Sequence, residues 1–191
     1  MDIAGAARLT SALRRARTGS AMRELTAGLL DRLGRRARRP SDVRELCRAL
    51  CEEMTVRRGG RRVEVRFERF PDEIEVTGLW VEFEEFDLII VEERAEEVQQ
   101  LVILGHELWH LHARHRHRHT ALDALSGWEG VPLTAAARDG SREVDEAEAD
   151  NFGHRLAAAV RGYLGPGGGE PGPGTAQRLL GYHNRRGGRG R

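Results

Sequence analysis

The chain has 191 residues and a formal net charge of +1, and its 31 basic residues are all arginine. It is long enough to bury a hydrophobic core, and we find neither a run of 18 apolar residues nor the residue order of a signal peptide at its N-terminus. We therefore expect a soluble, cytoplasmic protein. Cys47 and Cys51, four residues apart on an expected helix, favour reduced thiols over a disulfide and agree with that location.

Charge is distributed unevenly along the chain. Residues 1–62 contain 16 arginines and 7 acidic residues, whereas residues 63–100 contain 3 arginines and 13 acidic residues. Either the basic segment binds nucleic acid, or the two segments neutralise each other or form solvated faces. We favour the second interpretation, because residues 8–62 contain few side chains that read base edges and no helix-turn-helix signature. Direct binding of nucleic acid is therefore not expected.

The N-terminal residues 1–40 are predicted to form a basic helical extension. Residues 2–17 and 20–38 are rich in Ala, Leu and Arg, and their apolar residues recur at helical spacing, which predicts two short helices. Pro40 ends this region, because proline disfavours helix in the residue before it. A further helix is expected from Ser41, a good N-cap residue, with an apolar face made of Val43, Leu46, Cys47, Leu50 and Met54.

The main domain, expected at residues 41–165, continues with three strands. Residues 63–67 alternate apolar and charged side chains, which is typical of a half-buried strand. Residues 78–83 are a second candidate. Residues 87–91 are apolar in their middle and are expected to lie deep in the sheet. We predict an α+β fold with a small, mostly antiparallel sheet.

The candidate functional site lies in residues 101–111, where His-Glu-Leu-Trp-His stands inside an apolar run that predicts a buried helix. Histidines four residues apart share one helical face, so His106 and His110 can bind one metal ion. Glu107 is then placed to act as general base on a metal-bound water. A divalent cation would offset the cost of burying these groups. The alternative is a chance pattern with two solvated or backbone-bonded histidines.

A catalytic zinc ion needs three protein ligands and an open position for water, and this helix provides only two. We expect the third ligand on a helix over residues 141–156. Glu146 is favoured because Asp150 follows it by one turn, where it can accept a hydrogen bond from a ligating imidazole and set its tautomer. The competing acids on the same helix are Glu143, Asp145 and, as the closest rival, Glu148. These ligand types indicate Zn²⁺ as the cofactor, and iron or manganese are the alternatives that the same ligands can bind.

The remaining segments are expected to be a solvated run, a connection over the active-site side, and a tail. Residues 112–119 alternate His and Arg, and their spacing keeps them off the helical face of His106 and His110, which favours a solvated segment. Residues 120–140 are predicted to be a long irregular connection. Residues 166–191 are rich in Gly, Pro and Arg and are expected to be a disordered tail.

Taken together, the motifs resemble the ImmA/IrrE family of zinc metallopeptidases over roughly residues 41–160. That family has an H-E-x-x-H helix and a downstream helix with the pattern E-x-x-A-[ND]-x-F-[AG], which residues 106–110 and 146–153 match, and strands precede both. This chain departs from the family at Trp109, where a small residue is frequent and a tryptophan could narrow the site. Gly153 stands where Ala is more usual.

The resemblance implies a zincin-like core with zinc on His106, His110 and Glu146, and Glu107 as base. It implies hydrolysis of a peptide bond in a protein substrate, a helix-turn-helix DNA-binding repressor, in stress or mobile-element regulation. The alternative is a toxin of a toxin–antitoxin pair, with an antitoxin as partner, or a non-catalytic binding protein on the same fold. The donor that would stabilise the oxyanion is left open among His112, His154 and Tyr163.

Overall fold

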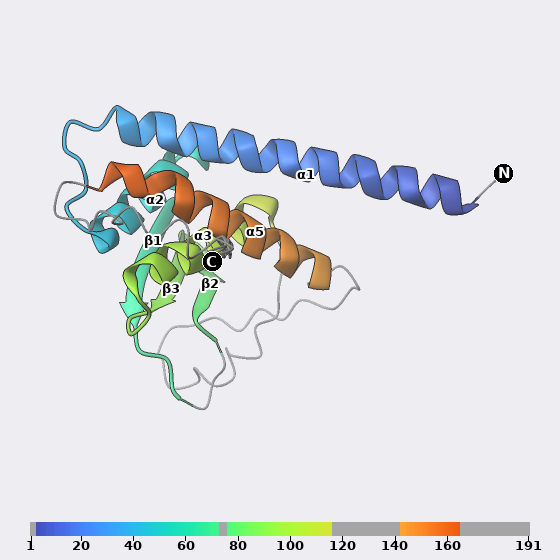
Figure 1. The fold of residues 1–191 in the computed structure, drawn as a ribbon. Helices are drawn as coiled ribbons and strands as arrows, with labels where there is room; N and C mark the ends of the chain where they lie inside the picture. Colours follow the sequence, from blue (N-terminus) through green and yellow to red (C-terminus); the bar gives the residue numbers. More distant parts are fainter. Residues whose placement is uncertain (1–2, 73–75, 116–141, 165–191) are drawn as a thin grey trace, which may run out of the picture.

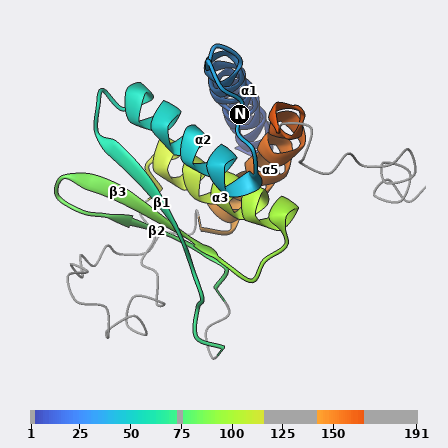
Figure 2. The ribbon, with the colours of Figure 1, turned by 90° about the vertical axis from the view of Figure 1, so that its left-hand side faces the viewer.

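The computed structural model describes residues 3–72, 76–115 and 142–164 of the chain. These residues form four α-helices, one short 3₁₀ helix and a three-stranded sheet: α1 (Ile3–Gly34), α2 (Val43–Arg57), β1 (Arg62–Glu68), β2 (Gly78–Glu82), β3 (Phe86–Glu92), α3 (Glu97–Ala113), α5 (Arg142–Val160) and η1 (Arg161–Tyr163). Helices α2 and α3 cover one face of the sheet, and α1 and α5 form a further layer above them (Figures 1 and 2). The predicted α+β class is confirmed.

The sheet has the strand order β1-β3-β2, with β3 in the centre. Strand β3 is buried along nearly its whole length, as its apolar middle predicts. It pairs antiparallel with β2, to which a tight connection joins it, and parallel with β1. The prediction of a mostly antiparallel sheet is therefore wrong. The chain crosses from β1 to the far edge before returning through β3, and β1 thus runs in the same direction as its neighbour.

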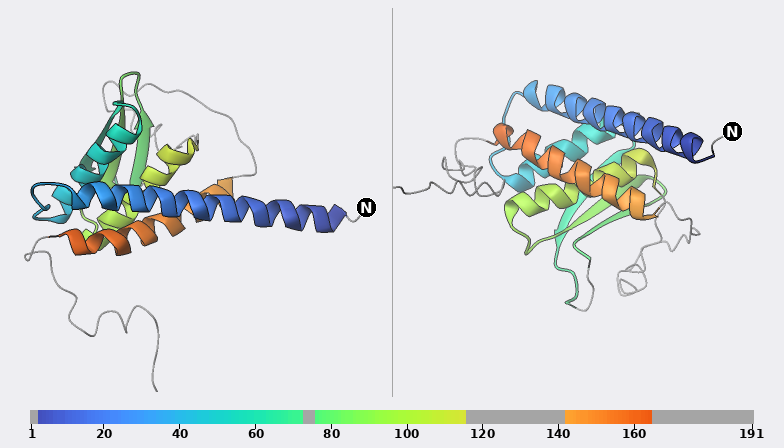
Figure 3. Two further views of the ribbon diagram at one scale, coloured as in Figure 1. Left: turned by 90° about the horizontal axis from the view of Figure 1, so that it is seen from above. Right: turned by 45° about the vertical axis from the view of Figure 1, so that its right-hand side comes forward.

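Helix α1 is continuous over Ile3–Gly34, so the prediction of two short helices is wrong. The expected break lies at Thr18 and Gly19, but a glycine within a helix costs only about 1 kcal/mol relative to alanine. Burial of an apolar stripe outweighs that cost. Met22, Leu25, Leu29 and Leu33 pack in one hydrophobic cluster with side chains of α2, α3 and α5. The other end of α1 projects beyond the body of the molecule (Figure 3).

Helix α2 has its N-cap one residue later than predicted. Its N-cap is Asp42, whose Oδ1 accepts a hydrogen bond from the backbone N–H of Glu45 at 2.7 Å. Ser41 instead donates to the Glu45 carboxylate through its hydroxyl at 2.7 Å. The predicted apolar face is buried, and Cys47 and Cys51 are free thiols within it, as expected. Burial raises the pKa of Cys47 to about 12, so this thiol is not a reactive nucleophile.

Arginines from the basic first third of the chain pair with acids from other segments. Arg58 and Arg61 both bind the fully buried Asp87, at 3.0 and 2.8 Å. Arg14 of α1 binds Asp145 of α5 at 3.1 Å. These pairs favour the interpretation that the basic and acidic segments compensate each other in the fold.

Some sequence-based expectations fall outside the described residues. These are the His/Arg run beyond residue 115, the connection over residues 120–140 and the tail over residues 166–191. Among the helices that the structure does describe, none has the length and apolar character needed to cross a bilayer.

Glu92, the last residue of β3, is expected to make the free energy of unfolding depend on pH in the acid range. Its carboxylate accepts backbone N–H groups of Phe70 at 3.1 Å and Arg94 at 2.9 Å, and it pairs with the Arg94 guanidinium. The guanidinium, with these N–H groups, lowers the pKa of Glu92 to about 2. In the unfolded chain the pKa is about 4.3. This stabilisation is therefore complete above about pH 4.3 and is lost as the pH falls toward 2.

The variant Glu92→Gln is expected to be less stable than the wild type near neutral pH by about 1–3 kcal/mol, because the charged acceptor is lost. The difference should shrink as the pH is lowered. Urea unfolding at about pH 6 and at about pH 3 measures both values. Glu84→Gln, at an exposed position in the turn between β2 and β3, is the matched control. An unchanged difference at the two pH values would contradict the assignment.

Candidate metal centre

Helix α3 carries the H-E-x-x-H sequence in the middle of the molecule. Its residues from Gln100 to Leu111 are almost all buried, as the apolar pattern predicts. His106 and His110 lie one helical turn apart, and their Nε2 atoms are 2.8 Å from each other. The two rings therefore direct the same ring nitrogen toward one point beside the helix.

Helix α5 brings Glu146 to that point. The Oε2 atom of Glu146 is 3.3 Å from Nε2 of His106 and 3.7 Å from Nε2 of His110. Hydrogen bonding to the two imidazoles lowers the pKa of Glu146, so its carboxylate is anionic at neutral pH. The structure thus brings together His106, His110 and Glu146, the two histidines and the acid that the sequence singled out.

A contact between two glycines allows this approach of α5 to α3. A Cβ on Gly153 would lie 2.5 Å from the carbonyl oxygen of Val102, and one on Gly105 would lie 2.8 Å from Cα of Gly153. Only glycine at both positions lets the two backbones come this close. Gly153 lies two turns after Glu146 on α5, so the same helix face that touches α3 also presents the carboxylate to the histidines.

The three side chains fit a divalent cation. Two ligand atoms each about 2.1 Å from a tetrahedral ion stand roughly 3.4 Å apart, and the three observed separations of 2.8, 3.3 and 3.7 Å lie around that value. Two neutral imidazoles and one carboxylate are the donor set of catalytic zinc sites that keep one position open. His106, His110 and Glu146 would hold the ion.

The carboxylate of Glu107, beside these ligands, has a buried oxygen without a hydrogen bond among the described residues. The side chain is only 4 % exposed, and the oxygen concerned is Oε2. The backbone N–H of Trp80 in β2 donates to the carboxylate, while burial raises the pKa of Glu107. A Cβ at Gly78 would lie 2.8 Å from Oε1 of Glu107, so this glycine leaves room for the carboxylate between α3 and the strand. An orphaned buried acceptor calls for a water or an ion near it.

Asp150 holds one of the two imidazoles. Its Oδ1 atom lies 2.9 Å from Nδ1 of His106. If this Nδ1 carries the proton and donates to the carboxylate, the Nε2 lone pair is free to bind a cation. The i+4 spacing from Glu146 predicts such a contact without specifying which histidine makes it, and the structure assigns it to His106.

His115 is a site residue that the sequence analysis missed. Helix α3 ends at Ala113, and its C-cap residue Arg114, with a left-handed φ of 56° and ψ of 39°, turns the chain back on itself. His115 consequently lies beside the preceding turn, with its Nδ1 atom 3.2 Å from Nδ1 of His110. The expectation that the His/Arg run stays away from the histidine face is wrong at this residue. It assumed a continuing helix, whereas the reversal at Arg114 changes the geometry.

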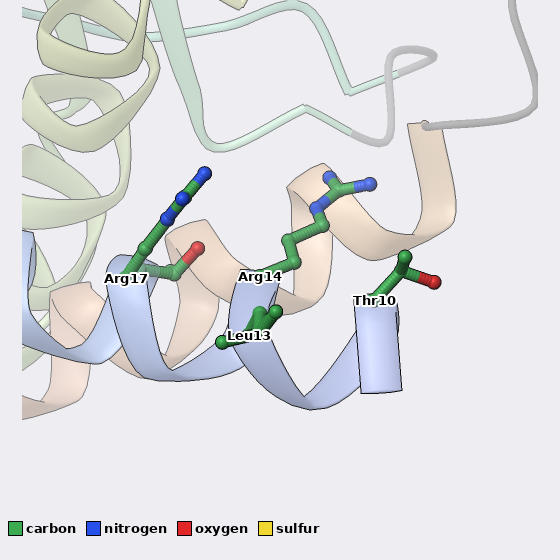
Figure 4. Close-up of a pocket in the computed structure, with 5 residues that line it drawn as sticks. Thr10, Leu13, Arg14 and Arg17 are labelled. Atoms are coloured by element: carbon green, nitrogen blue, oxygen red, sulfur yellow. The ribbon is translucent and has the colours of Figure 1, made fainter. Parts of the chain in front are cut away.

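The competing acids of α5 point elsewhere. Glu143 is exposed, whereas Asp145 and Glu148 form a second group with His115 whose ligand-type atoms lie within 4.8 Å of one another. Side chains of α1 already meet these acids. Arg14 donates to Asp145 at 3.1 Å, and Thr18 donates to Glu148 at 3.2 Å. Figure 4 shows Arg14 extending from α1 beside Leu13 and Arg17, and these side chains line a pocket on that helix.

Other residues considered from the sequence lie apart from the imidazole pair. Trp109 is 3 % exposed and packs on Phe152, with ring centroids 5.1 Å apart, so it fills the core and does not narrow the site. Among the candidate oxyanion donors, His112 packs against Trp109, Tyr163 lies against Gly34 of α1, and His154 is exposed. No oxyanion donor is therefore assigned among them.

Comparison with known proteins does not identify a family. No protein-family model matches the sequence. Neither the curated proteins nor the solved structures yield a match. The resemblance to ImmA/IrrE peptidases therefore depends on the motifs of the chain and on the side-chain arrangement described above.

Proposed function

We propose that the protein is a zinc-dependent metallopeptidase of ImmA/IrrE type, with a zincin-like catalytic core. The observation that carries the proposal is the convergence of His106, His110 and Glu146 beside the buried, partly unsatisfied carboxylate of Glu107. Chance pairing of two histidines would not explain why an acid from a helix 36 residues later along the chain completes the group. Nor would it explain the orphaned acceptor next to it.

The chemistry follows from what each side chain can do. When bound, a zinc ion acidifies water and polarises a substrate carbonyl. Glu107 accepts the proton of the attacking water at its carboxylate and passes it to the leaving amine. Its raised pKa suits this role, because it makes the carboxylate a stronger base toward water. Asp150 orients His106 through Nδ1.

Strand β2 is the natural place for an extended peptide. It forms one edge of the three-stranded sheet, it packs against α3, and its Trp80 backbone contacts Glu107. A substrate strand added to this edge would bring its carbonyl groups near the imidazole pair. The acidic residues Glu82, Glu84 and Glu85 lie at the end of this strand and favour a basic substrate. We propose a helix-turn-helix DNA-binding repressor as that substrate.

Metal analysis tests the first requirement of the proposal. Purified wild-type protein is expected to bind one zinc ion, and Glu146→Gln is expected to bind it at least about 10-fold more weakly, because an anionic ligand is replaced by a neutral amide. Glu143→Gln, at an exposed position on the same helix, is the matched control and should bind like the wild type. Cleavage of a repressor encoded beside the gene, lost with a chelator and restored by zinc, tests the reaction. Equal zinc affinity in wild type and Glu146→Gln would refute the ligand assignment.

A further inference from the structure

A line of polar contacts runs from His110 to the N-terminal helix. Nδ1 of His110 lies 3.2 Å from Nδ1 of His115. On the other side of that ring, Nε2 of His115 is 3.7 Å from Oδ1 of Asp145. The same oxygen accepts a hydrogen bond from Nη2 of Arg14 at 3.1 Å. Three residues from separate parts of the chain therefore stand in sequence behind one proposed metal ligand.

The tautomers that these contacts require of His110 and His115 are compatible with each other. To present a lone pair at Nε2, His110 must carry its proton at Nδ1. That N–H can be donated only to an acceptor, so Nδ1 of His115 must be unprotonated. His115 then carries its proton at Nε2, which faces the anionic carboxylate of Asp145. The guanidinium of Arg14 donates to the same carboxylate from its other side.

Burial strengthens the electrostatic contacts among His110, His115 and Asp145. The side chains of His110, His115 and Asp145 are 2 %, 14 % and 10 % exposed, so solvent screens their interactions little. The guanidinium of Arg14 belongs to a side chain that is 52 % exposed, so its effect is more strongly screened. His106 differs, because its orienting partner Asp150 is 68 % exposed and contacts it directly.

We propose that His115 is a positioning residue for His110, and that Asp145 and Arg14 in turn hold His115. Helix α1, which carries Arg14, thereby contributes to the metal centre. The inference rests on the proposed function, since it concerns how one ligand of that centre is held. His115 sets the tautomer and the ring angle of His110. Arg14 holds the Asp145 carboxylate in place through its hydrogen bond.

A competing interpretation places a second cation on His115, Asp145 and Glu148, whose ligand-type atoms lie close together. The contacts argue against it. Arg14 and Thr18 already donate to the two carboxylates, and a cation would have to displace the guanidinium. Nδ1 of His115 also faces His110. We therefore expect one zinc ion per chain.

The test measures metal binding in the full-length chain, independently of catalysis. Zinc affinity by chelator competition is expected to fall about 10- to 100-fold in His115→Ala, the range typical for partners behind a metal ligand. His115→Gln should recover part of this loss, because its amide oxygen can accept the proton of His110. Arg14→Gln should weaken zinc by about two- to fivefold, and Arg15→Gln, an exposed neighbour on α1, should not.

The visible spectrum of the Co²⁺-substituted protein reports the ligand geometry itself. It should change in His115→Ala and return toward the wild-type form in His115→Gln, which a purely structural role of His115 would not produce. Wild-type zinc affinity and an unchanged cobalt spectrum in His115→Ala would overturn the inference and leave the proposed function standing. So would two zinc ions in the wild type that fall to one in His115→Ala. A wild-type chain that binds no zinc would refute both the inference and the proposed function.

Discussion

Replacing Glu107 with glutamine is expected to lower the rate of peptide hydrolysis by about 10²- to 10⁴-fold while zinc stays bound. Glutamine has nearly the same shape and can still accept the backbone N–H of Trp80, but it cannot take a proton from water. The ligand group of His106, His110 and Glu146 does not include this side chain. The loss should therefore appear in kcat, with zinc affinity unchanged.

Two measurements on the same preparation separate the outcomes. Cleavage of the partner repressor measures the chemical step, and chelator competition measures the metal. Equal cleavage by wild type and Glu107→Gln would rule out the general-base mechanism. A biological effect that persists in Glu107→Gln, with zinc bound and no cleavage by either protein, would instead favour a toxin or binding protein on the same fold.

Replacing Gly153 with alanine is expected to destabilise the fold by about 1–3 kcal/mol, the usual cost of overpacking a tight contact. The new Cβ would lie 2.5 Å from the Val102 carbonyl oxygen and 3.1 Å from the backbone nitrogen of His106, and backbone atoms cannot turn aside as a flexible side chain can. The helix propensity of alanine offsets this by at most about 1 kcal/mol. Helices α3 and α5 should separate slightly.

That separation should reach the metal centre. Glu146 stands two turns before Gly153 on the same face of α5, so zinc affinity should fall together with stability. Gly162→Ala is the matched control, because nothing lies within 4 Å of a Cβ at that position. Urea unfolding and chelator competition measure the two effects. Stability and zinc affinity equal to those of the wild type would mean that the two helices do not need the glycine contact.

The same contact gives a physical reason for one difference between this chain and the ImmA/IrrE pattern that its motifs resemble. Where the family more usually has alanine, Gly153 packs here against Gly105 of α3. The sequence shows both glycines but does not show that they face each other. Their partnership depends on how two helices cross, which local spacing does not determine.

The local spacing of residues determined several helices and strands and the position of the candidate ligands on them. The four-residue spacing of His106 and His110 places both rings on one helix face, and the apolar runs predict α2, β3 and the burial of α3. The i+4 relation of Asp150 to Glu146 likewise predicts that both acids lie on the side of α5 that meets the histidines. These features need only the geometry of one helix or one strand at a time.

Tertiary structure decided the rest. Helix crossing selected Glu146 over Glu148, and strand order made β1 parallel to β3. Burial of an apolar stripe kept α1 in one piece, and a left-handed residue at Arg114 returned His115 to the site. Each outcome depends on which faces of distant segments pack together. The packing of distant segments depends on the burial and close contacts of the whole chain. Short-range residue patterns therefore do not predict it.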